Sequence, residues 1–258
     1  MIETKSRTEL ETMDRANRVV RTILGELVER VRPGVSTAEL NQYAEKRLAE
    51  LGARPAFKGY PHPDGGPSYP AVLCTSINEE VVHGIPAARR MLKEGDILSL
   101  DFGAVIDGLY GDAAVTVPVG RVGETATKLI EVTRTSLMKG IEQVRPGNRI
   151  LDIAAAVQSH AEAHGFSVVR SFVGHGIGRR LHEDPPVPNF VDRGPNPRLT
   201  PGMVLAIEPM VAAGDYEVEV AADRWTACTR DRTLSAHFEL SVAVTAEGPW
   251  VLGEPVRR

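Results

Sequence analysis

Hydrophobic residues recur every three or four positions in four segments of the chain, which is the spacing of one face of an α-helix. In the first segment, Leu10, Val20 and Leu24 belong to such a face. In the second segment, Ser36 and Glu39 have the positions of a capping box, which marks the start of a helix. The pattern therefore predicts helices over residues 8–31, 36–52, 124–144 and 149–164.

Shorter hydrophobic runs with strand character lie between the helical pairs. They cover residues 71–74, 96–101, 113–117, 167–169, 203–207 and 240–245. Strands that follow pairs of helices favour an α+β fold in which helices cover one face of a sheet. Two segments, 60–69 and 184–188, are so rich in proline and glycine that we expect loops there. No linker interrupts the pattern, which predicts a single domain over residues 1–258.

One pattern of glycine turn, hydrophobic strand and carboxylate occurs twice. The first copy ends in Asp101 and the second ends in Glu208. A His-Gly-Ile motif precedes each copy, at His83 and again at His175. A chain that brings an acid and a histidine twice is expected to build one site between two similar halves.

The repetition extends to the helical segments. Arg-Pro-Gly follows the first helix of each pair, at residues 32–34 and 145–147. We therefore expect two pseudo-symmetric halves, roughly 8–120 and 121–250, with the active cleft between them. Chance recurrence of common turn signals is the alternative.

The composition is ordinary for a soluble globular protein, with 42% hydrophobic and 25% charged residues. A formal net charge of -4 argues against a surface built to bind nucleic acid. No hydrophobic run resembles a signal peptide or is long enough to span a bilayer, so we expect a cytoplasmic protein without a membrane partner. The two cysteines, Cys74 and Cys228, are too few for a disulfide framework.

Asp101 and Asp112 lie on two short strand-like runs that a turn around Asp107-Gly108 connects. If a four-residue loop joins the strands, the two carboxylates face each other directly on one side of the sheet. If a two-residue turn joins them, Asp101 lies opposite Ala114 instead. Close carboxylates repel each other unless cations lie between them, so the direct pairing predicts a site for two metal ions. A hairpin with solvated acids is the alternative.

Three further residues extend this candidate metal site. His175 lies between glycines, and a neutral imidazole is a common metal ligand. Glu208 ends one hydrophobic strand and Glu239 begins another, where an unpaired buried carboxylate would be costly. Taken singly, His175 is equally typical of a loop histidine, and the two acids are more typical of exposed strand ends. Taken together with Asp101 and Asp112, they offer four negative charges and one nitrogen, a set that suits two manganese, iron(II), cobalt or zinc ions.

The order and spacing of these motifs resemble those of type I methionine aminopeptidases, from about residue 8 to residue 250. The segments that carry the resemblance are 76–86, 95–101, 107–112, 174–178, 203–210 and 235–239. The resemblance implies the pita-bread fold, a curved antiparallel sheet covered by helices, with pseudo-twofold duplicated halves. It also implies a dinuclear metallopeptidase that hydrolyses the initiator methionine from nascent proteins and from peptides with a small second residue.

The resemblance further implies a role for each candidate ligand. Asp101 would bind one cation, and His175 and Glu208 would bind the other. Asp112 and Glu239 would bridge the two. The expected chemistry is metal-assisted hydrolysis of the N-terminal peptide bond, in which Glu208 moves a proton.

Two histidines outside the ligand set, His83 and His182, match positions that contact substrate and transition state in the family. Exposed loop histidines are the alternative reading. The residues that resemble the lining of the methionine pocket are Tyr60, Tyr69, Cys74 and Trp225. The implied partners are nascent polypeptide N-termini, and we expect a monomer. Docking at the ribosome is left open by the sequence.

Several positions depart from the family pattern. Segment 61–67 is longer than expected, and Leu181 stands where an aromatic residue is usual. His237 and Leu240 stand where a polar amide and a histidine are usual. These differences leave the ligand set intact but could reshape the substrate pocket, so a specialised paralogue is one alternative.

Two other functions are compatible with this fold. A proline-specific peptidase of the same fold usually has a large additional N-terminal domain, for which we expect no room before Leu10. A metal-free binding protein with this fold would have lost ligands, whereas all five candidates are present.

Overall fold

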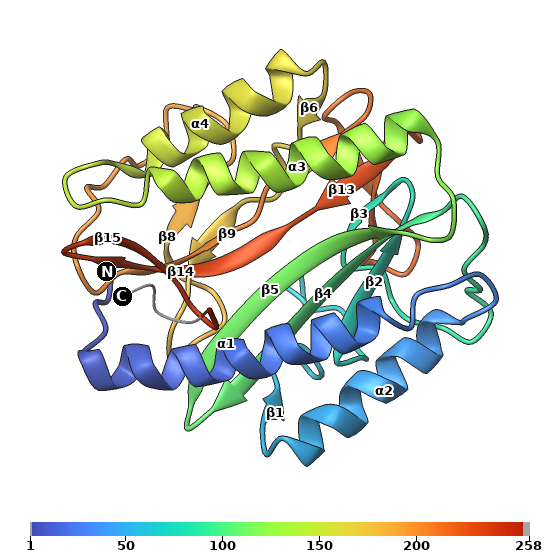
Figure 1. Ribbon diagram of the computed structural model, residues 1–258, viewed down its shortest axis with the longest axis horizontal. Helices are drawn as coiled ribbons and strands as arrows, with labels where there is room; N and C mark the ends of the chain where they lie inside the picture. Colours follow the sequence, from blue (N-terminus) through green and yellow to red (C-terminus); the bar gives the residue numbers. More distant parts are fainter. Residues whose placement is uncertain (1, 255–258) are drawn as a thin grey trace.

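Four α-helices form at the predicted segments and lie in two pairs. The computed structural model describes residues 2–254. The expected capping box joins Ser36 to Glu39, and a second one joins Ser6 to Glu9 at the first helix. The helices are α1 (Arg7–Val28), α2 (Thr37–Glu50), α3 (Glu124–Glu142) and α4 (Ile150–Ala163). In Figure 1 the blue pair α1 and α2 lies at the bottom of the view, and the green-yellow pair α3 and α4 lies at the top.

Both helix pairs pack on one face of a nine-stranded sheet, in which every pairing is antiparallel. Its main path runs through β1 (Arg54–Pro55), β4 (Ile97–Ile106), β5 (Leu109–Pro118), β14 (Glu239–Thr245), β9 (Val204–Ile207), β7 (Gly174–Gly176) and β8 (Glu183–Val187). Off this path, β2 (Leu73–Ile77) pairs with β4, and β15 (Gly248–Val251) pairs with β14.

Two smaller three-stranded sheets complete the described chain. One contains β6 (Ser167–Val168), β10 (Met210–Ala212) and β13 (Ser235–His237). The other contains β3 (Glu80–Val82), β11 (Val218–Val220) and β12 (Ala227–Thr229). Each of the six strand runs expected from the sequence overlaps a strand of the structure. Among residues 2–254, no helix combines the length and the hydrophobicity needed to cross a bilayer.

The loop expected over residues 184–188 was wrong, because this segment contributes β8. Gly174 pairs with Val187, and His175 pairs with Pro186. A proline cannot donate a ladder hydrogen bond, but β8 is the edge strand of the sheet, where that donor is not needed. The loop expected over residues 60–69 is confirmed, since no helix or strand forms there.

The two halves of the chain repeat the same local hydrogen bonds. The N–H of Gly95 donates to the carbonyl of Val119, and in the second half the N–H of Gly202 donates to that of Val244. The strand order β2-β4-β5 of the first half is mirrored by β7-β9-β14 of the second. The pseudo-twofold duplication expected from the repeated carboxylate pattern is therefore confirmed.

Side chains alternate along a strand, and this alternation decides which face of the sheet carries the acids. Leu98, Leu100 and Phe102 of β4 pack in one hydrophobic cluster with residues of α1. Asp101 lies between Leu100 and Phe102 in the strand, so its side chain points to the opposite face. Ile207 packs with residues of α3 and α4, and Glu208 follows it on the opposite face. The helices therefore cover one face, and the acids lie on the other.

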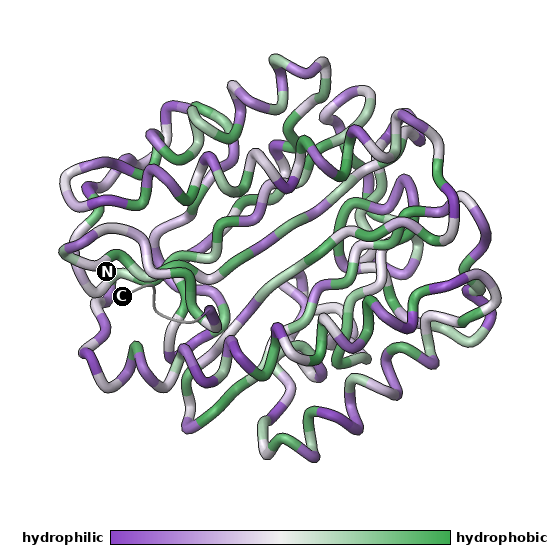
Figure 2. The backbone as a smooth tube through the Cα atoms, viewed as in Figure 1, coloured by the Kyte–Doolittle hydropathy of each residue, from purple (hydrophilic) through white to green (hydrophobic). Residues whose placement is uncertain are grey.

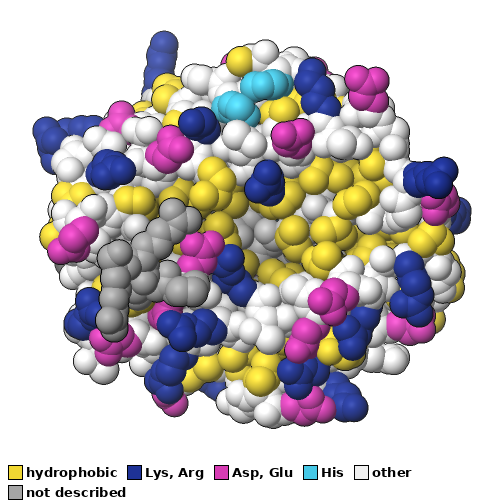
Figure 3. Space-filling model, viewed as in Figure 1, with side chains coloured by type: hydrophobic (Ala, Val, Ile, Leu, Met, Phe, Trp, Pro, Cys, Tyr) yellow, Lys and Arg dark blue, Asp and Glu magenta, His cyan; other side chains and the backbone are white. Residues whose placement is uncertain are grey.

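The hydropathy pattern agrees with this layering. Figure 2 shows the helices alternating between hydrophobic and hydrophilic positions, whereas the central strands contain longer hydrophobic stretches. On the helix-covered side, Figure 3 shows a band of hydrophobic side chains between the two helix pairs, with charged side chains around it.

Candidate metal and peptidase site

The hairpin of β4 and β5 has the second of the two registers considered. Asp107 and Gly108 form a two-residue turn, and both have positive φ, 50° and 80°. Asp101 therefore lies opposite Ala114, and the direct pairing of Asp101 with Asp112 was wrong. The two acids still share a face, because Asp112 and Ala114 are two positions apart on one strand.

Small residues make room for the acids of this hairpin. Asp112 lies opposite Gly103, and a Cβ added to Gly103 would come within 2.7 Å of the Cβ of Ala56. Ala114 lies opposite Asp101 on one side and opposite Glu239 of β14 on the other. Three neighbouring strands thus bring three carboxylates to one region of the sheet.

His175 brings an imidazole to these acids from β7. Its Nδ1 lies 2.9 Å from the carbonyl oxygen of Gly176. Because a carbonyl only accepts hydrogen bonds, Nδ1 is the donor, and Nε2 of the neutral ring therefore has no hydrogen. That nitrogen lies 3.4 Å from Oε1 of Glu208. Burial, and then the neighbouring His182, lower the pKa of His175 to about 3, so the ring is neutral and able to bind a cation.

The glycines beside His175 are needed for strand packing. A Cβ at Gly174 would lie 2.3 Å from the carbonyl oxygen of Ala206, and one at Gly176 would lie 2.1 Å from that of Asp184. Only glycine allows the neighbouring strands to approach His175 this closely.

The surroundings of the four acids disfavour their ionised form. Burial raises the pKa of Asp101 to about 7 and that of Glu208 to about 8. Burial also raises the pKa of Asp112 and of Glu239 well above the usual range, and nearby carboxylates raise both further. Such a cluster is costly as a set of anions unless positive charge lies among them.

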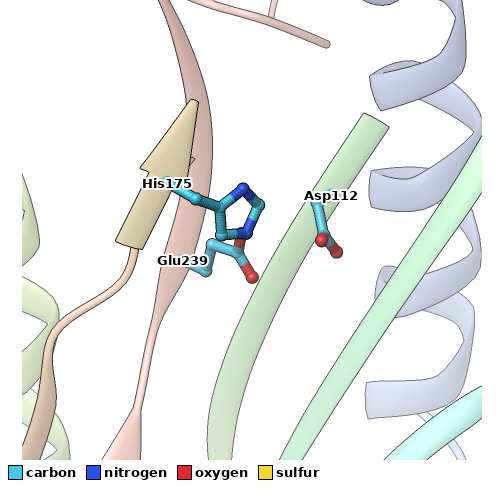
Figure 4. A group of neighbouring side chains, drawn as sticks. All are labelled: Asp112, His175 and Glu239. Atoms are coloured by element: carbon cyan, nitrogen blue, oxygen red, sulfur yellow. The ribbon is translucent and has the colours of Figure 1, made fainter. Parts of the chain in front are cut away.

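Two observations test whether these side chains fit divalent cations. Ligand atoms of Asp112, His175 and Glu239 lie within 4.8 Å of one another, as Figure 4 shows for the three side chains. Within residues 2–254, one buried oxygen each of Asp101, Asp112 and Glu239 has no hydrogen-bond partner. Buried polar atoms normally have partners, so oxygens left free around one space are suited to binding an ion. The donor set of oxygens with one imidazole matches that of a manganese, iron, cobalt or zinc site.

His83 and His182 lie at the same cavity. The ring of His182 contacts that of His175 edge-on, with centroids 4.3 Å apart, and its Nδ1 hydrogen-bonds with the hydroxyl of Tyr60. The ring of His83 has its edge against Phe172, with centroids 5.5 Å apart. Burial lowers the pKa of both histidines, to about 4 for His83, so both are neutral at pH 7.

The four expected pocket residues also meet here. The single O–H of Tyr69 is shared between the carbonyls of Gly84, at 3.0 Å, and Leu73, at 3.2 Å, and burial raises the pKa of this hydroxyl well above the usual range. Trp225 packs its ring against Tyr69 and donates its indole N–H to the carbonyl of Pro67. A cavity of about 220 Å³ is lined by all eleven candidate residues: Tyr60, Tyr69, Cys74, His83, Asp101, Asp112, His175, His182, Glu208, Trp225 and Glu239.

One residue beside the ligand candidates was absent from the sequence-based set. His237 of β13 is 1% exposed, and its Nε2 lies 3.6 Å from Oε2 of Glu208. Ligand atoms of Glu208, His237 and Glu239 lie within 4.8 Å of one another. The signal in the sequence is the departure from the usual amide at this position, from which we expect a reshaped substrate pocket.

Comparison with known proteins identifies the class of this site. Residues 11–246 match the metallopeptidase family M24, and the chain belongs to this family. The methionine aminopeptidase of Clostridium acetobutylicum is 48% identical over 252 residues, which is 98% of each chain. Methionine aminopeptidase 1 of Bacillus subtilis is 47% identical over 96% of this chain and 97% of its own. The resemblance to methionine aminopeptidases is thereby confirmed.

Solved structures give the same result for the fold. The crystal structure of methionine aminopeptidase from Thermotoga maritima has a TM-score of 0.94 and 44% identity, and the match covers 99% of this chain and 100% of that one. An Xaa-Pro dipeptidase from Bacillus anthracis has a TM-score of 0.76 at 20% identity, over 99% of this chain and 63% of that one. The second likeness is one of fold alone, the pita-bread fold.

Proposed function

We propose that this chain is a methionine aminopeptidase that hydrolyses the peptide bond after an N-terminal methionine. The observation that carries the proposal is the meeting of one imidazole and four carboxylates around one cavity, with oxygens that have no other partner. Close relatives over nearly the full chain have this name, which supports the same activity here.

Two divalent cations are the proposed cofactors. Asp101 would hold one, His175 and Glu208 would hold the other, and Asp112 and Glu239 would be ligands of both. The four carboxylates then have the positive charge that their burial requires.

When bound, the cations would supply Lewis-acid activation of the scissile carbonyl and of the attacking water. Glu208 accepts the proton that this water loses and returns it to the departing amine. His83 and His182 are neutral, so their N–H groups donate to the oxygen on which negative charge develops. Tyr60 orients His182 through its hydroxyl.

Methionine binds where the cavity is apolar. Tyr69, Cys74 and Trp225 line that part, and Trp225 is fixed by its bond to the Pro67 carbonyl. The limited volume of about 220 Å³ favours a small second residue in the substrate. The physiological substrates are then nascent polypeptide N-termini, processed by a cytoplasmic monomer that consists of one catalytic domain.

Peptide cleavage tests the proposal. The chelated protein is reloaded with manganese or cobalt and offered Met-Ala, Met-Gly, Met-Phe and an Xaa-Pro dipeptide. We expect methionine release from the first two, slower release from Met-Phe and none from the Xaa-Pro substrate. Cleavage of Xaa-Pro alone would assign the chain to proline-specific peptidases, and inactivity with every cation and peptide would contradict the enzymatic function.

A further inference from the structure

The carboxylate of Glu208 lies between two imidazoles. Its Oε1 faces Nε2 of His175 at 3.4 Å, and its Oε2 faces Nε2 of His237 at 3.6 Å. Nε2 of His175 is the free nitrogen of that ring, because Nδ1 donates to Gly176. If His175 and Glu208 hold one cation, Oε1 is the oxygen placed to share it with His175, and Oε2 is left for another partner.

The ring of His237 is buried near the carboxyl groups of Glu208 and Asp101. Within residues 2–254, neither Nδ1 nor Nε2 has a hydrogen-bond partner, although the residue is 1% exposed. A buried N–H without an acceptor destabilises the folded state, so a buried imidazole is expected to have a partner nearby. Glu208 offers one after a closure of about half an ångström, and hydrogen bonds of this kind often tighten when a site is loaded.

The backbone around both residues is fixed. The hydroxyl of Thr116 accepts from the N–H of His237 and donates to its carbonyl, both at 2.8 Å. The side chain of Asn189 donates to the carbonyl of Glu208 at 3.0 Å. His237 also pairs with Met210 across β13 and β10, two residues after Glu208. Neither side chain can therefore move far from the other.

We propose that His237 is a positioning residue, which donates its Nε2–H to Oε2 of Glu208 and so directs Oε1 toward the cation shared with His175. Carboxylates that bind metals are usually held by such a second hydrogen bond. His237 is not among the residues that line the cavity, which favours support of Glu208 over direct ligation. This inference rests on the proposed function, since it assumes that Glu208 binds a cation.

Matched amide variants test it. In His237→Gln the side-chain amide nitrogen lies close to the position of Nε2 and can donate to Glu208, whereas in His237→Asn it lies closer to that of Nδ1 and cannot reach. His237→Leu removes the donor. Calorimetric titration with manganese should give affinities about 10- to 100-fold weaker for the Asn and Leu variants, and within about threefold of wild type for the Gln variant.

The controls separate the possible outcomes. Urea unfolding of each chelated variant verifies folding, and the Gln–Asn comparison remains valid if the Leu variant does not fold. Equal losses in Gln and Asn, with a changed cobalt absorption spectrum, would mean that the imidazole itself binds the cation and would overturn the proposal. Unchanged affinity in all variants would also overturn it. A wild-type protein that binds no cation would instead refute the proposed function.

Discussion

Nε2 of His175 lies 3.4 Å from Oε1 of Glu208, although His175 belongs to β7 and Glu208 directly follows β9. Their counterparts in the first half are His83 and Asp101, from the same repeated pattern. There the histidine, with a positive φ of 63°, packs its ring edge against Phe172 instead. The two histidines of the duplicated pattern therefore have different surroundings, and we propose a ligand role for His175 and a substrate-binding role for His83.

Removal of one bridging acid should abolish stabilisation by cations. Glu239→Gln keeps the shape of the neutral acid that burial favours, so the chelated variant should fold as the wild type does. Manganese at 100 times its dissociation constant should stabilise the wild type by about 2.7 kcal/mol and the variant by almost nothing. Urea unfolding with and without manganese measures both. Glu247→Gln, an exposed acid just beyond β14, is the control and should respond as wild type. An equal response of Glu239→Gln would exclude it as a ligand.

Loss of His182 should impair catalysis without weakening cation binding. His182→Ala removes a donor to the developing charge, and we expect kcat to fall about 100- to 1000-fold. Tyr60→Phe removes only the hydroxyl bonded to His182 and should cost less. Steady-state kinetics on Met-Ala, together with manganese titration, distinguishes the roles. A matching loss of manganese affinity in His182→Ala would mean that His182 is a ligand.

The chelated protein should lose stability between pH 6.5 and 8.5. The folded-state pKa is raised to about 7 for Asp101 and to about 8 for Glu208. A raised pKa gives stability that is present below the unfolded value and is lost as pH rises through the folded value. The buried histidines have lowered pKa values, so their effect on the free energy of unfolding is confined to pH values below about 6.5. We expect the free energy of unfolding, measured with urea, to fall by about 2 kcal/mol over this range. Manganese should reduce or reverse this fall. Stability that rises over this range without cations would contradict the assignment.

The pair of Lys5 and Glu183 should support the segment that contains His182. The two side chains are 2% exposed and 2.5 Å apart, and Glu183 also accepts from the backbone N–H of Arg179 and Arg180. Glu183→Gln leaves the ammonium without its counter-charge, at a cost of about 3 kcal/mol. We also expect a lower kcat, because His182 is the preceding residue. Full activity and stability of the variant would show that the pair is dispensable.

A double variant provides the control for that pair. Lys5→Met combined with Glu183→Gln removes both charges and should recover part of the stability lost in Glu183→Gln alone. Additive losses would mean that the two residues do not interact in solution.

Local signals in the sequence were sufficient for the helices and for the face that carries the acids. The capping residue Ser36 and the alternation around Asp101 depend on neighbours within a few positions. Pairing between distant strands was harder to predict. The prolines in 184–188 indicated a loop because the sequence does not reveal that this strand lies at the edge of the sheet.

The candidate site shows the same limit. The sequence allowed two registers for the hairpin, and the φ angles of Asp107 and Gly108 select the shorter turn. His237 was noticed only as a departure, because its proximity to Glu208 arises from the pairing of β13 with β10, far apart in the chain. The spacing of the residues in the sequence did not show which candidate ligands share a cation. The assignment of each ligand to a cation came from the family resemblance.

A crystal soaked in manganese chloride and measured at a wavelength with strong manganese anomalous scattering tests the central proposal most directly. We expect two anomalous peaks per chain, one beside Asp101 and one between His175 and Glu208, with Asp112 and Glu239 reaching both. Peaks only at other positions, or none at saturating manganese, would contradict the proposed metal centre.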